Sequence, residues 1–234
     1  RSSLCCTWPP VTMSSVFMVM GVWKGLIGVY GVWSIYAYGL SLIRHELVLN
    51  EDETTMAKWA LGIYVAMCMV DESKAVMTRR PLNEHVHHIA TAIGYSLDLL
   101  LGSRRIIGLA TCTLASDCVG PFYEYYAYLK ATGHHRNSRA TAATVICSII
   151  VTLFVRLPLC VVVVGIAIND ALIAAGLVQL HLIPSMQNKA EANRATAVDE
   201  IQPHLLLPSA LGAIAILWLD SIWMRKWAFP LLAQ

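Results

Sequence analysis

The sequence predicts an all-α, polytopic membrane protein, a transmembrane bundle of six or seven helices. Of the 234 residues, 57% are hydrophobic and only 14% are charged, well below the roughly 25% that a soluble domain uses to cover its surface. The apolar residues are gathered in runs of span length, because about 20 residues of helix cross a hydrocarbon core of about 30 Å. Inside that core only a helix satisfies every backbone group within its own segment, so we expect each run to be helical.

Four apolar runs of span length occupy the first 130 residues. We expect spans at Val16–Ile43, Met56–Val70 (extending towards Met77), His85–Leu101 and Ile106–Tyr128. The segments between them are polar: an acidic loop, a charged segment and a tight basic turn. These are Glu46–Glu53, Asp71–Glu84 and Gly102–Arg105.

The first span carries a packing signal. Gly21, Gly25 and Gly28 are spaced so that another helix can approach its backbone closely. Lys24 lies near the start of the same span, and we expect its long side chain to snorkel outward to the membrane surface.

The last hundred residues predict the remaining spans. The chain is apolar from Ala140 to Ile183, which is too long for one crossing. Arg156, Pro158, Asn169 and Asp170 interrupt it, so we expect a fifth span to about Gly165, and then a sixth span or a re-entrant helix. That second segment is Ile168–Ile183; a polar linker, Pro184–Pro203, and a last span, Leu205–Trp223, follow it. The total is therefore six or seven.

The domain organisation follows from these runs. We expect a polar N-terminal segment over residues 1–15, one transmembrane domain over 16–228 with its polar linker at 184–203, and a tail over 229–234. Because the first residue is Arg1, we expect the chain to be a processed product or an incomplete sequence. The N-terminus and the segments Asp71–Glu84 and Lys130–Arg139 share one side, which carries more Lys and Arg and is therefore predicted to face the cytosol or its equivalent.

Two classes of function are not indicated. A net charge of +2, with no basic stripe among aromatics, gives no sign of nucleic-acid binding. The seven cysteines include no CxxC pair, and adjacent histidines on a helix diverge by about 100°, so we expect no metal site.

Ionisable residues within the predicted spans are the candidate site, because charge inside a membrane usually marks a pathway or a binding site. On the third span a polar stripe recurs at helical spacing. Its members are Glu84, His87, His88, Thr91 and Tyr95. On the fourth span Asp117 and Glu124 lie on one face, and Arg156 on the fifth could neutralise either carboxylate. We expect the three helices to face one polar cavity; the alternative is that each polar side chain simply fastens two helices together.

These residues also carry a resemblance. The stretch His87-His88-Ile89-Ala90-Thr91 resembles the HHxxT signature of the TLC-domain membrane proteins. Ser116–Phe122 is similar to the SE-x-S-x-PF segment of the branch that lacks synthase activity, with Asp117 as the acid and Val119 in place of the second serine. Phe154–Pro158 resembles the family's FxxRxP segment, and Leu217-Trp218, before Ile222, resembles its last helix. The motifs span about residues 55–228 in the family's order.

The resemblance implies six or seven helices around a lipid-accessible central cavity. In the ceramide synthases of this family the histidine pair belongs to an acyl-transfer site that takes acyl-CoA. The synthases also carry a His-Asp-x-x-Asp run where this chain reads Ala115–Gly120, so the histidine and the second aspartate are missing. The non-synthase relatives are therefore the better match.

Three functions stay open from the sequence. The first is a TLC-type protein that binds or handles membrane lipid in its polar cavity, with no cofactor. The second is an accessory subunit of a larger membrane complex. The third is an acyl-CoA-dependent acyltransferase, in which His87 or His88 is the base, Asp117 or Glu84 orients it, and Tyr95 or Arg156 stabilises the oxyanion. The expected location is the endoplasmic reticulum or an organellar membrane such as the mitochondrial inner membrane.

Overall fold

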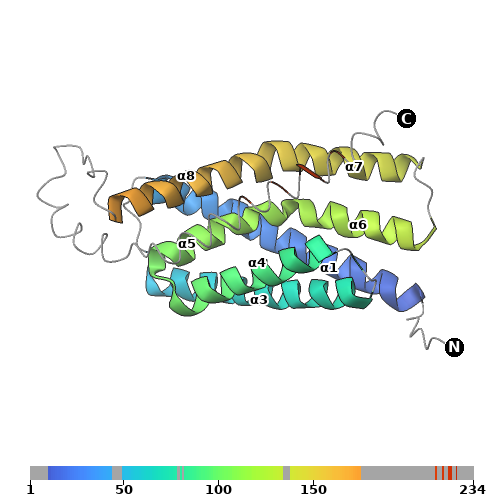
Figure 1. Ribbon diagram of the computed structural model, residues 1–234, viewed down its shortest axis with the longest axis horizontal. Helices are drawn as coiled ribbons and strands as arrows, with labels where there is room; N and C mark the ends of the chain where they lie inside the picture. Colours follow the sequence, from blue (N-terminus) through green and yellow to red (C-terminus); the bar gives the residue numbers. More distant parts are fainter. Residues whose placement is uncertain are drawn as a thin grey trace, which may run out of the picture.

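The computed structural model describes residues 10–43, 49–77, 80, 82–133 and 138–174, with isolated positions at 214, 218, 221, 222 and 225, and this part of the chain is all-helical apart from short turns. The predicted all-α class is confirmed. The helices form rods that lie roughly parallel to one long axis, and consecutive rods run in opposite directions (Figure 1). As a result, the starts of α1, α4 and α7 and the ends of α3 and α6 share one end of the bundle, as expected from the loop assignment.

Within the described residues the elements join into five rods. The first is α1 (Pro10–Ser34), the π-helix η1 (Ile35–Gly39) and α2 (Leu40–Ile43); α3 (Glu51–Met77) and α4 (Leu82–Leu101) follow. The fourth is α5 (Arg104–Thr113), the 3₁₀ segment η2 (Leu114–Val119) and α6 (Gly120–Ala131), and the fifth is α7 (Arg139–Val151), the π-helix η3 (Thr152–Arg156) and α8 (Leu157–Ala174).

Three of these rods are long and apolar enough to cross a membrane. Their apolar stretches are Ser15–Ile43, Arg104–Lys130 and Arg139–Asp170. The helices α3 and α4, of 27 and 20 residues, are as long as a bilayer requires but are more polar. The structure thus shows a helical protein with three candidate spans, and the expected number of six or seven is not shown.

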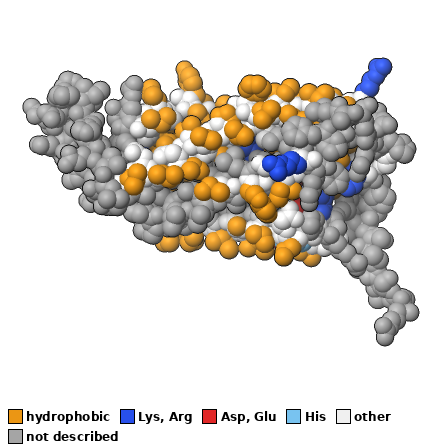
Figure 2. Space-filling model, turned by 45° about the horizontal axis from the view of Figure 1, so that its top comes forward, with side chains coloured by type: hydrophobic (Ala, Val, Ile, Leu, Met, Phe, Trp, Pro, Cys, Tyr) orange, Lys and Arg blue, Asp and Glu red, His pale blue; other side chains and the backbone are white. Residues whose placement is uncertain are grey.

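The bundle has an apolar core, but its exterior is also apolar and its interior also holds polar side chains. Large apolar side chains such as Val29, Trp59 and Phe154 are exposed, and apolar atoms cover much of the described surface in Figure 2. Charged and hydroxyl side chains are buried beside the apolar core, including Arg105, Asp170 and Thr111. A bilayer stabilises this arrangement, because exposed apolar groups meet hydrocarbon there while buried polar groups pair with one another.

Two prolines account for irregular helix. Pro121 has no N–H for the carbonyl of Asp117, and the Gly120 N–H bonds that carbonyl instead, which gives the 3₁₀ turn of η2. Pro158 follows η3, where the N–H of Leu157 reaches back to the carbonyl of Thr152 in a π-type bond. Both irregular segments hold a predicted site residue, Asp117 in η2 and Arg156 in η3.

The predicted break between the fifth and sixth spans is wrong. The helix α8 runs without interruption from Leu157 to Ala174 and so passes through Gly165, Ile168 and Asp170. The polar pair Asn169-Asp170 does not end the helix, because Asp170 is fully buried against an arginine of α5. The rest of the predicted sixth span, the linker 184–203 and most of the last span lie outside the described residues.

The glycine packing signal is confirmed. The helix α1 packs against η2 and α6, and a β-carbon on Gly28 would lie 2.5 Å from the backbone nitrogen of Cys118. One turn further along, a β-carbon on Gly31 would overlap the backbone of Ala115. These glycines let α1 approach the segment that carries Asp117 at backbone distance.

Candidate functional site

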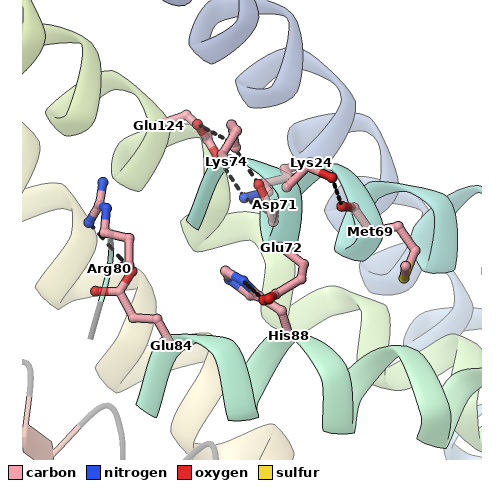
Figure 3. Close-up of polar contacts among 10 residues, drawn as sticks. Lys24, Met69, Asp71, Glu72, Lys74, Arg80, Glu84, His88 and Glu124 are labelled. Carbon is pink, nitrogen blue, oxygen red and sulfur yellow. Dashed lines mark hydrogen bonds and ion pairs between the residues drawn. The ribbon is translucent and has the colours of Figure 1, made fainter. Parts of the chain in front are cut away.

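A buried group of four charges joins three helices near the end of the bundle where α4 begins. This charged quartet consists of Lys24 on α1, Asp71 and Lys74 on α3, and Glu124 on α6 (Figure 3). The Lys24 ammonium lies 2.7 Å from Asp71 and 2.5 Å from Glu124, and the Lys74 ammonium lies 2.7 Å from Asp71 and 2.9 Å from Glu124. The two positive and two negative charges give the quartet a net charge of zero. Such pairing offsets the desolvation free energy that buried charges otherwise cost.

The expected outward course of Lys24 is therefore wrong. Its side chain turns into the bundle, and its methylene groups pass over Gly120, where a β-carbon would lie 2.7 Å from the Lys24 Cβ. Two carboxylates from other helices attract the ammonium more strongly than the membrane surface does. Glycine at position 120 thus leaves the space that the lysine stem fills.

The quartet sets the charge state of Asp71, the first residue of the charged segment Asp71–Glu84. Burial alone would raise the pKa of this carboxyl, but the ammonium groups of Lys24 and Lys74 outweigh burial and hold the pKa below its ordinary value. Asp71 therefore stays ionised at neutral pH, as the ion pairs require.

A second polar group lies beside the quartet, between α3 and α4. The Glu72 carboxylate faces two histidines, with Oε1 2.7 Å from His85 Nδ1 and Oε2 3.6 Å from His88 Nδ1. Figure 3 shows Glu72 beside His88. We expect Asp117 or Glu84 to orient His87 or His88, and the structure places the Glu72 carboxylate beside His88, with its hydrogen bond going to His85. Glu84 forms an exposed ion pair with Arg80 at 3.4 Å, so it does not join the interior.

The predicted stripe continues inward along α4. The His87 ring lies 5.5 Å from the His88 ring, and its Nδ1 is 3.5 Å from the Thr91 hydroxyl. One turn further on, the Tyr95 hydroxyl lies 2.6 Å from the hydroxyl of Thr113 on α5. His87, Thr91 and Tyr95 therefore face the bundle interior as the helical spacing predicts.

Asp117 lies near Tyr95 of this stripe, and Tyr64 of α3 links the two. Its carboxylate accepts a hydrogen bond from the Tyr64 hydroxyl of α3, and the Tyr64 ring packs edge-on against Tyr95 at 4.9 Å. The second carboxylate oxygen, Oδ2, is buried and makes no hydrogen bond to the residues that the structure describes. Asp117 thus combines a satisfied oxygen with a buried oxygen that could accept from a ligand.

Arg156 supplies positive charge to this region. It is buried in η3, which packs against η2, and its charge acts on both Asp117 and His87. The prediction left open which carboxylate Arg156 neutralises. The structure places Asp117 within its electrostatic reach, while the two lysines of the quartet neutralise Glu124.

A further buried ion pair lies at the other end of the bundle. Arg105 donates from Nε and from one terminal nitrogen to Asp170, at 2.9 and 3.1 Å, and also donates to the carbonyl of Leu42 at 2.9 Å. The pair joins α2, α5 and α8. The forked geometry fixes both the distance and the orientation of the two helices that carry the charges.

Several of these residues were missed from the sequence. Each of them contacts a predicted site residue or another buried polar residue; they are Lys24, Asp71, Glu72, Lys74, Tyr64 and Arg105. The sequence does hold one indication, because the three-residue spacing of Asp71 and Lys74 places both on one face of α3. No group of three or more His, Cys, Asp and Glu side chains that could hold a metal ion occurs in the described part of the chain.

No protein-family model, curated protein or solved structure matches this chain.

Proposed function

We propose that this chain is a multi-pass membrane protein of TLC type that binds the polar headgroup of a lipid between its helices. The observation that carries this proposal is the buried Oδ2 of Asp117, which lacks a hydrogen bond among the described residues. An acceptor left unsatisfied in the interior costs about 1 to 3 kcal/mol, and more when it is charged. A ligand that donates a hydrogen bond to this oxygen would remove that cost.

The surroundings of Asp117 favour a headgroup with hydroxyl or amine donors. The Asp117 carboxylate is an acceptor only, and the neighbouring hydroxyls of Tyr64 and Tyr95 both donate and accept. The exterior of the rods is apolar, so a lipid could reach the helices from the bilayer with its tails in hydrocarbon. This combination supports a lipid rather than a water-soluble ligand.

Lipid mass spectrometry of the purified protein tests the proposal. We expect lipid to co-purify with the wild-type chain and to be retained at least about tenfold less by Asp117→Asn, whose amide nitrogen donates where Oδ2 accepts. Glu84→Gln is the matched control, because Glu84 pairs with Arg80 at the exposed end of α4. Equal retention by the wild type and Asp117→Asn would overturn the proposal.

The same purification addresses the two other functions. A protein that co-purifies in fixed stoichiometry, with no bound lipid, would favour the accessory-subunit prediction. Acyl transfer requires His87 or His88, so activity with an acyl-CoA that disappears in the doubly substituted His87→Ala, His88→Ala chain would favour the acyltransferase prediction.

A further inference from the structure

An open surface depression of about 520 Å³ lies between the beginnings of α3 and α5. Both helices begin at the end of the bundle opposite to the charged quartet (Figure 1). The lining is polar and comes from both helices and from the turn before α5. It consists of Glu51, Thr54, Thr55, Lys58, Gly102, Ser103, Arg104 and Ile107.

The charges of this lining favour an anion. The Lys58 side chain is exposed and has no ion-pair or hydrogen-bond partner among the described residues. Arg104 donates to the carbonyl of Leu49 at 3.3 Å and lies 3.8 Å from the Glu51 carboxylate. The Glu51 side chain is 90% exposed, so solvent screens that pair strongly. Two cations and one anion leave the lining with a net charge of +1.

With this end of the bundle at the surface of a bilayer, Lys58 would lie at the depth of the lipid headgroups. It lies seven residues after the first residue of α3, about 10 Å along the helix axis. Trp59 beside it is 71% exposed, and tryptophan is enriched at membrane–water interfaces. A lysine at this depth meets lipid phosphates rather than bulk water.

From these observations we propose that the depression binds the phosphate of a membrane phospholipid, held by Lys58 and Arg104. The net charge of +1 matches the single negative charge of a phosphodiester. This site is separate from the interior around Asp117 and does not depend on the function proposed for it.

Native mass spectrometry of the full chain in detergent, titrated with dioleoylphosphatidylglycerol, tests the site. We expect one lipid to bind, and Lys58→Gln and Arg104→Gln each to weaken that binding by about fivefold, since one basic residue near a lipid surface contributes about that much. Arg139→Gln is the control, because Arg139 is also exposed but lies at the opposite end of the bundle. Dioleoylglycerol, which lacks the phosphate, should bind the wild type and Lys58→Gln equally.

Three results would overturn the proposal. These are unchanged phosphatidylglycerol binding by Lys58→Gln, an equal loss in Arg139→Gln, and inorganic phosphate competing as strongly as the lipid. Lys58 is exposed, so Lys58→Gln should fold even if Arg104→Gln does not. Asp117→Asn should leave this binding intact, which separates the site from the interior one.

Discussion

The ammonium group of Lys24 and the carboxylate of Glu124 form an ion pair that joins α1 to α6 across 100 positions of sequence. Both side chains are largely buried. Lys24 also contacts Asp71 of α3, and Glu124 also contacts Lys74 of α3. Three helices therefore meet at one neutral group of charges. Removing any single charge leaves an uncompensated ion in the interior.

Substituting Lys24 by methionine should destabilise the protein by about 3 to 5 kcal/mol, because Glu124 and Asp71 would then share one ammonium. Resistance to denaturation in detergent, followed by circular dichroism, measures the change. Arg139→Gln removes an exposed charge and should have an effect within about 0.5 kcal/mol. Equal stability of Lys24→Met and wild type would show that the quartet does not hold the helices together.

Stability should fall in acid through Asp71. Its pKa is lower in the folded state than in the unfolded chain, so its contribution is present above the unfolded value of about 4 and is lost as the pH falls through the folded pKa. We expect unfolding midpoints measured at decreasing pH to decline below about pH 4. Asp71→Asn should show a shallower decline, and an identical pH profile would contradict this assignment.

Replacing glycine by alanine on α1 should destabilise the protein at the positions where the backbone of η2 lies close to α1. Gly28→Ala and Gly31→Ala place a β-carbon against Cys118 and Ala115 and should cost about 1 to 3 kcal/mol through overpacking. Gly94→Ala is the matched control, since a β-carbon there meets nothing within 4 Å. It should be neutral or stabilising by up to roughly 1 kcal/mol, and thermal melts of the three variants would separate the two cases.

The ion pair between Arg105 and Asp170 should require arginine specifically. Arg105→Lys keeps the charge but loses the fork that contacts both Asp170 oxygens and the Leu42 carbonyl. We expect a clear drop in the melting temperature for Arg105→Lys and a larger drop for Asp170→Asn, which leaves the arginine without its carboxylate. If Arg105→Lys melts like the wild type, the forked geometry is not what stabilises this end.

The two ends of the bundle should lie on opposite sides of a membrane. Asp52 and Arg139 are exposed near opposite ends, so cysteines introduced at these positions should react with an impermeant maleimide from opposite faces of sealed vesicles. The basic-loop rule predicts that position 139 faces the cytosol or its equivalent. Labelling of both positions from one face would contradict the placement of the two ends on opposite sides of a membrane.

Patterns along a single helix were predicted well from the sequence. The apolar run of α1, its glycines and the polar stripe of α4 each depend on one helical period, and apart from Glu84 they lie where that period places them. The inward course of His87, Thr91 and Tyr95 follows from the same spacing.

Pairings between helices could not be predicted in this way. The sequence predicts an outward Lys24 because its partners, Asp71 and Glu124, are far away in the sequence. It predicts a helix break at Asp170 because the partner Arg105 belongs to another rod. Charge compensation depends on which helices are neighbours, and hydropathy carries no information about that.

The π-turn at Thr152–Arg156 has a consequence for the orientation of the arginine. A π-turn contains one more residue than a regular turn, so it rotates everything after it by roughly 100° about the helix axis. Here the guanidinium is buried while Phe154, two positions earlier, is 76% exposed. Deleting a single residue from this turn would restore an ordinary helix and swing the arginine towards hydrocarbon. The extra residue of the π-turn therefore keeps the Arg156 guanidinium facing the interior, where its charge acts on Asp117.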